Sequence, residues 1–136
     1  MQRIVVAAKA GSDQPWLADA AAELAQQTGA AVSVVSMDGL DVEALSPTPR
    51  SVFQENASKT IEGFLDRLRE QGVQAEGEAR PGPVTLGVLL FAEEKEADVI
   101  VCGASTKSKV ARRVLGSVPM ELIGRSRRPV LVITPP

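Results

Sequence analysis

The segment that decides the fold reads VIVCG (99–103), then ASTKSK (104–109) and, a few residues later, GSV (116–118). Its first part is an apolar run typical of a buried strand, and this run stops at Gly103. Its last part places a glycine and a serine where a helix begins. Strand ends and helix N-termini direct backbone N–H groups outward, and such groups suit anions. The segment therefore predicts a phosphate-binding loop between a strand and a helix.

The alternation of strand and helix extends from this segment to both ends of the chain. Short apolar runs predict strands at 4–8, 32–37, 99–102 and 130–133, and a period-two pattern predicts an edge strand at 73–79. Helical periodicity predicts a long helix over 53–68, and three further helices that begin at Ser12 or Asp13, at Gly82-Pro83 and at Ser117. The third helix in chain order is expected to continue through Ala97.

This order of elements predicts the fold class. Strands that are nearly all apolar, each followed by a helix, indicate a parallel sheet with helices on both faces. Right-handed crossovers then give a doubly wound α/β domain, and we expect residues 1–136 to form a single domain. Ligands of such sheets bind beyond the carboxyl ends of the strands, at the point where the strand order reverses.

The residue types that are missing exclude several kinds of chemistry. The chain has no histidine, no tyrosine and one cysteine, Cys102. It therefore holds no Ser/His/Asp or Cys/His arrangement, no Cys/His zinc site and no internal disulfide. No apolar run approaches the ~20 residues that span a bilayer, and no cleavage site follows the first apolar run. We expect a cytoplasmic protein without a metal site and without a membrane or nucleic-acid partner.

The net charge of −2 hides a strong asymmetry. Residues 1–102 carry 8 basic and 16 acidic side chains, whereas residues 103–136 carry 7 basic side chains and one acidic side chain. This pattern suggests an anionic ligand at the C-terminal end. Arginines near the end of the last helix also suit the helix dipole, and that interpretation accounts equally well for Arg125, Arg127 and Arg128. Lys107 and Lys109 lie before the helix, where contact with an anion is favoured.

Over its whole length the chain resembles the universal stress proteins. The resemblance includes Gly11-Ser12 after the first strand, the turn RPGP (80–83) and, most specifically, residues 103–132. The family's nucleotide-binding signature is Gly-x2-Gly-x9-Gly-Ser or Gly-Thr. Here Gly103 is the first glycine, and nine residues (107–115) precede Gly116-Ser117, so the spacing is intact.

The resemblance implies a five-stranded parallel sheet in the order 3-2-1-4-5 and a site for ATP or AMP. The main chain of Ser36 stands where the family contacts adenine. The last strand would be an uncovered edge, so the resemblance also implies a homodimer formed from Val130 to Thr134. The nucleotide-binding residues carried over are Ala8, Lys9, Ser36, Gly103, Thr106, Lys107, Gly116, Ser117 and Val118.

Two positions depart from the family pattern. Thr106 stands in place of the second glycine, and a β-branched residue disfavours the positive φ that glycine allows. The family carries an aspartate near the ribose and the metal directly after the first strand, where this chain has Lys9 or Ala10. Lys9 adds positive charge, which favours an anion without metal and leaves the need for Mg²⁺ open.

Three functions therefore stand as alternatives. The first is adenine-nucleotide binding, the second is a nucleotide-free dimeric interaction module, and the third is slow ATP hydrolysis. The third is the least favoured because no general base is in position. Structural interpretations stand beside these: Gly103 as a strand-ending turn, Gly116-Ser117 as a helix cap, Cys102 as a core residue and Trp16 as packing near a helix start.

Overall fold

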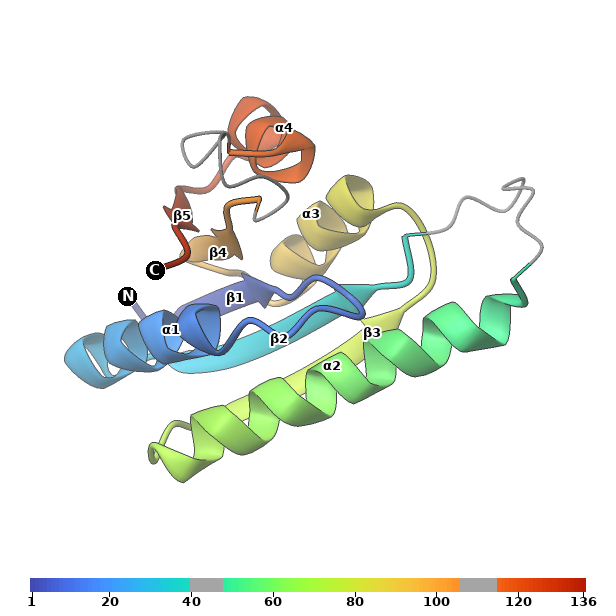
Figure 1. The fold of residues 1–136 in the computed structure, drawn as a ribbon. Coiled ribbons are helices and arrows are strands. Elements are labelled where there is room, and N and C mark those ends of the chain that lie inside the picture. The colour runs from blue at the N-terminus through green and yellow to red at the C-terminus, as the bar shows by residue number, and fades with distance from the viewer. Residues whose placement is uncertain (40–47, 106–114) are drawn as a thin grey trace.

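The computed structural model describes residues 1–39, 48–105 and 115–136 and shows one parallel sheet between two layers of helices (Figure 1). The sheet order is β3-β2-β1-β4-β5, which confirms the predicted α/β fold and strand order. None of the helices in these ranges is long and apolar enough to span a bilayer. In chain order the elements are β1 (Arg3–Ala7), α1 (Pro15–Thr28), β2 (Ala31–Met37), α2 (Arg50–Glu70), β3 (Ala75–Arg80), α3 (Val84–Glu94), β4 (Val99–Gly103), α4 (Ser117–Arg125) and β5 (Val130–Ile133).

The central strand β1 is buried on both faces. Val6 of β1 stands opposite Val34 of β2 and Val101 of β4, and all three side chains are fully buried. Residues on one face of the sheet pack against α1 and α2, and residues on the other face pack against α3 and α4. The aliphatic strands therefore form two cores, one on each side of the sheet.

The predicted N-terminal caps of two helices are wrong. Gln14, and not Ser12 or Asp13, is the N-cap of α1, and no side chain caps that helix. Gly116, and not Ser117, is the N-cap of α4, so Ser117 is the first helical residue. In both cases a polar residue was predicted to cap from its intrinsic preference. The cap is a nearby residue instead: Gln14 directly precedes Pro15, the first residue of α1, and Gly116, at φ 97°, directly precedes Ser117.

Helix α3 ends three residues earlier than predicted. Its last residue is Glu94, and the Ala97 N–H donates to Ala92 O at 2.9 Å while the Glu96 N–H donates to Glu93 O at 3.1 Å. These two bonds, with a left-handed Glu96 at φ 51°, form a Schellman motif. Ala92 and Ala97 are both buried, so the cap also closes the core.

A close contact between α3 and β2 fixes the separation of helix and sheet below the site. A Cβ atom on Gly87 of α3 would fall on the Met37 side chain and lie 3.0 Å from its Cγ atom. Met37 is 4% exposed, at the end of β2. Glycine is thus required at this position for packing, inside a helix where it is otherwise unfavourable.

Gly87→Ala is expected to destabilise the fold by about 1–3 kcal/mol, because the core side chain Met37 must be displaced. Gly63→Ala is the matched control, since Gly63 lies inside α2 with no atom within 4 Å of the added Cβ. The control should stabilise by up to about 1 kcal/mol. Urea unfolding followed by circular dichroism measures both values, and equal effects at the two positions would contradict the packing role of Gly87.

Candidate functional site

The sheet order reverses between β1 and β4, and the predicted site residues of both strands lie at this reversal. Ala7 of β1 pairs with Cys102 of β4, so Ala8, Lys9 and Gly103 follow at the same carboxyl edge. The Ala8 N–H donates to Val35 O at 2.9 Å, which holds the chain in line as it leaves β1. The crevice at such a reversal is where ligands of doubly wound sheets bind.

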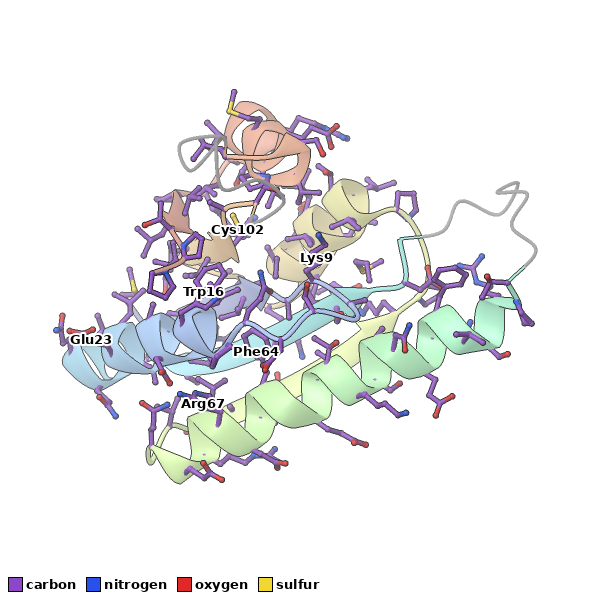
Figure 2. The ribbon with its side chains drawn as sticks, viewed as in Figure 1. Lys9, Trp16, Glu23, Phe64, Arg67 and Cys102 are labelled. Carbon is purple, nitrogen blue, oxygen red and sulfur yellow. The ribbon has the colours of Figure 1, made fainter. Side chains whose placement is uncertain are left out.

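Gly103 is a glycine because helix α1 packs against it. A Cβ atom at Gly103 would lie 2.6 Å from Trp16 Cη2 and 2.9 Å from Gln14 Nε2. Trp16, labelled in Figure 2, lies in the first turn of α1, and its side chain also packs against the core under α1 and α2. The predicted packing role of Trp16 is confirmed, and the missing side chain of Gly103 makes room for protein atoms.

The end of β4 and the start of α4 are held together. The Ser105 N–H donates to Leu115 O at 3.0 Å, which closes the intervening loop. Gly116 has φ 97°, and a Cβ atom there would lie 3.0 Å from Ser105 Cβ. Any side chain at Gly116 would strain the backbone, with or without a ligand. The predicted residues Thr106 and Lys107 lie outside the described residues.

Helix α4 presents uncapped N–H groups at this edge. Its N-terminus carries no side-chain cap, and the N–H of Met120, the fourth residue of the helix, donates to Gly116 O at 3.3 Å. Pro119 has no N–H, so the free donors of the first turn belong to Ser117 and Val118. Uncapped donors at the positive end of a helix dipole suit an anion.

Lys9 brings a cation to the same crevice. Its side chain is exposed, and it forms no ion pair within residues 1–39, 48–105 and 115–136. The loop that carries it is a turn in which the Ser12 N–H donates to Lys9 O at 3.1 Å. Gly11, at φ 76°, donates its N–H to Thr60 Oγ1 at 3.0 Å, which anchors this loop to α2. Thr60 could not be singled out from the sequence, because it lies within a regular helical pattern.

Ser36 is buried where the resemblance places an adenine contact. It pairs with Ala79 inside the β2–β3 ladder, one residue before β2 ends, and has no exposed surface. Its hydroxyl makes no hydrogen bond within the described part of the chain. Met37 and Asp38, which follow Ser36, are buried as well, so Gly39 is the first exposed residue after β2.

Asp38 joins three elements at the rim of the site, and sequence reasoning missed it. Its Oδ1 atom accepts the Gly82 N–H at 2.9 Å, and its Oδ2 atom lies 3.0 Å from an Arg50 nitrogen at the start of α2. The Asp38 N–H also donates to Arg80 O at 2.9 Å. A carboxylate directly after an apolar strand, with an arginine at the next helix start, was the available signal.

The remaining candidates are structural in the described chain. Cys102 is 3% exposed, and burial raises the pKa of its thiol to about 11, which confirms it as a core residue. Arg125 is in the last turn of α4, and Arg128 Nε donates to Ala97 O at 2.7 Å. These arginines lie at the C-terminal end of α4, away from the uncapped N–H groups, as the helix-dipole interpretation predicts.

A groove of about 530 Å³ lies beside the site without containing any of the residues predicted to bind nucleotide. It runs between the loop after β1 and helix α2, and its lining includes Ser12, Thr60 and Phe64. Arg67 of α2, labelled in Figure 2, forms a 2.7 Å ion pair with Asp19 of α1. Of the predicted site residues that the structure describes, Ala8, Lys9 and Gly103 lie instead at the carboxyl edge of β1 and β4.

Comparison with known proteins identifies the family. Residues 1–134 match the universal stress protein family, and the chain belongs to it. A universal stress protein of Methanocaldococcus jannaschii is 30% identical over 105 residues, and the stress response protein NhaX of Bacillus subtilis is 26% identical over 113 residues. The matched segments cover 77% and 83% of this chain but only 62% and 66% of those proteins, so the chain spans less than two thirds of their length.

Solved structures give matches over nearly the whole chain. A universal stress protein from Archaeoglobus fulgidus superimposes with a TM-score of 0.80 at 25% identity, covering 98% of this chain and 99% of that one. The structure described as that archaeon's universal stress protein in complex with dAMP has a TM-score of 0.76 and covers 98% of both chains. A universal stress protein in complex with cAMP has a TM-score of 0.73 and covers 97% of this chain and 96% of that one. Both complexes are 25% identical to this chain.

Asp38→Ala is expected to destabilise the protein by about 2–3 kcal/mol, because it removes a buried carboxylate that accepts an N–H and pairs with an arginine. Asp13→Ala is the control, since Asp13 is exposed at the start of α1. The midpoint of urea unfolding measures the difference. A loss at Asp38 no larger than that at Asp13 would show that the three elements are held together without this carboxylate.

Proposed function

We propose that this protein binds an adenine nucleotide at the carboxyl edge of β1 and β4, and that it does so without a metal ion. The observation that carries the proposal is the uncapped N-terminus of α4, held against the end of β4 by the bond between Ser105 and Leu115. In two relatives of the same fold the bound molecules are dAMP and cAMP, both adenine mononucleotides. AMP is therefore the favoured ligand, with ATP as the alternative.

The charges at the edge support an anion. Lys9 supplies an exposed cation where the family pattern has an aspartate, and Ser117 and Val118 supply main-chain donors. The Asp38 carboxylate accepts the Gly82 N–H and pairs with Arg50, so its charge is already neutralised by protein groups. With a cation in place of the aspartate, the protein itself balances the phosphate charge, and Mg²⁺ has no carboxylate to bridge to at that position.

Lys9→Glu is expected to weaken AMP binding about tenfold or more, a loss of about 1.4 kcal/mol or more, because it reverses the charge beside the phosphate. Isothermal titration calorimetry with AMP and ATP, in EDTA and in Mg²⁺, measures the affinities. Wild-type affinity for AMP should be the same under both conditions.

The control for this experiment is Arg3→Glu, which makes the same charge change on an exposed cation at the opposite end of β1. It should leave AMP affinity within about twofold of wild type, since a strand rises about 3.3 Å per residue, which separates Arg3 from the site by more than a Debye length of about 10 Å. Absence of heat with millimolar AMP and ATP would overturn the nucleotide proposal. Binding that requires Mg²⁺ would overturn its metal-free form.

A second candidate function is a dimeric interaction module, and the contrast between the two sheet edges favours it. The edge strand β3 carries Glu76, Glu78 and Arg80, charges that discourage pairing with another chain. The other edge strand, β5, has the uncharged sequence VLVI, and its Leu131 is 41% exposed. The proposed partner is a second copy of this chain, paired antiparallel through β5. Nucleotide binding and dimer formation use different edges of the sheet and are compatible.

The surface beside β5 extends the proposed contact. Met120 and Ile123 of α4 are 58% and 50% exposed, and α4 covers the sheet face next to β5. If two β5 strands pair about a twofold axis perpendicular to the sheet, the two copies of α4 lie side by side. The same association would then cover the apolar strand edge and the apolar side of α4.

Leu131→Asp is expected to convert a dimer into monomers, because it places a charge in the paired edge. Sedimentation velocity measures the change. Val52→Asp is the matched control, since Val52 on α2 is 42% exposed, nearly the same as Leu131. Thermal melting confirms that both variants are folded. If the Leu131 variant is folded and still dimeric, the interface lies elsewhere.

A further inference from the structure

Gln14 borders the candidate site, although it belongs to none of the predicted motifs. It is the N-cap residue of α1, it contacts the residues that follow β1 and end β4, and it also lines the groove between the loop after β1 and α2. Its side chain is placed against Gly103, where a Cβ atom would lie 2.9 Å from Gln14 Nε2. Gln14 is only 7% exposed, so a carboxamide is buried at the point where the sheet order reverses.

The two ends of this carboxamide differ in their hydrogen bonding. The Lys9 N–H donates to Gln14 Oε1 at 3.2 Å, which fixes the oxygen toward the loop after β1. The nitrogen is thereby directed toward Gly103, and it makes no hydrogen bond within the part of the chain that the structure describes. A carboxamide nitrogen carries two N–H donors, and this nitrogen is not among the fully enclosed polar atoms of the described residues. Its donors are therefore accessible to a bound group.

Helix formation does not account for the side chain. Gln14 makes no side-chain capping bond to the first turn of α1, and Ser, Thr, Asp or Asn are the residues that cap a helix well. The longer glutamine extends instead across to the end of β4, in the space that the glycine at position 103 leaves. The side chain therefore contacts the ends of β1 and β4 and does not cap the helix.

We infer that Gln14 is a specificity-determining residue whose Nε2 donates to a phosphate oxygen of the bound mononucleotide. A carboxamide nitrogen only donates and an ionised phosphate oxygen only accepts, so the two are matched. A ribose hydroxyl can both donate and accept, so it is less specifically matched to a donor. Lys9 is linked to Gln14 through its own main chain and adds positive charge at the same place. The site thus holds the phosphate with an amide and an ammonium group. This inference rests on the proposed function.

The experiment replaces the donor and keeps the rest of the side chain. Gln14→Glu in the full chain retains the length and the oxygen that accepts the Lys9 N–H, but it exchanges the N–H donors for a carboxylate oxygen. Titration calorimetry with AMP and with adenosine, both in EDTA, separates contacts to the phosphate from contacts to the nucleoside. We expect AMP affinity to fall about tenfold or more while adenosine affinity stays within about twofold.

Gln27→Glu is the matched control. It makes the same change on the same helix, at an exposed position, and should bind AMP like the wild type. Gln14→Met is the second variant, because it keeps the length without charge or donors and should also lose affinity for AMP. Thermal melting shows whether each variant is folded. If Gln14→Glu fails to fold, the affinity of Gln14→Met decides.

Three outcomes overturn the inference or its basis. Wild-type AMP affinity in the folded Gln14 variants would show that Nε2 makes no contact with the ligand. An equal loss for AMP and adenosine would place the contact on the nucleoside and overturn the phosphate assignment. If the wild-type protein binds neither AMP nor ATP, the proposed function fails, and this result is distinct from the other two.

Discussion

Burial of β1 on both faces is the constraint on which the rest of the structure depends. Ile4, Val5 and Val6 have no exposed surface, so helices must cover the sheet on both sides of this strand. Right-handed crossovers satisfy that requirement only if the chain winds outward from β1 in two directions, through β2 to β3 and through β4 to β5. The crevice between β1 and β4 follows from this reversal. The site therefore results from the burial of the central strand.

Much of the fold was predictable from the sequence, because apolar runs that must be buried on both faces have few alternatives to a covered parallel sheet. The ends of the helices were less predictable. Ser12 and Ser117 have the local chemistry of caps, yet Gln14, which precedes Pro15, and Gly116, at φ 97°, hold those positions. The early end of α3 was equally hard to predict, because Ala97 is buried in the core as part of the C-terminal cap and not as a helical residue.

The candidate site was predictable only in part, because spacing in the sequence does not show what a glycine makes room for. The distance between Gly103 and Gly116 in the chain predicted a phosphate loop, and the structure shows that Ser105 and Leu115 are hydrogen-bonded to each other. The absence of a side chain at Gly103 nevertheless accommodates Trp16 and Gln14. Asp38 and Arg50 left only a weak signal, a carboxylate after an apolar strand and an arginine at the next helix start, and the contact between them could not be inferred from a single sequence.

The electrostatics of the crevice explain why the departures from the family pattern belong together. An aspartate after the first strand would place a negative charge beside a phosphate, and a metal ion would have to bridge the two. Lys9 removes that requirement, and Gln14, joined to the Lys9 main chain, adds a neutral donor on the same side. The uncapped N–H groups of α4 approach from the other strand end. If a nucleotide binds here as proposed, these groups of the described residues all favour its phosphate, and no metal is needed to hold it.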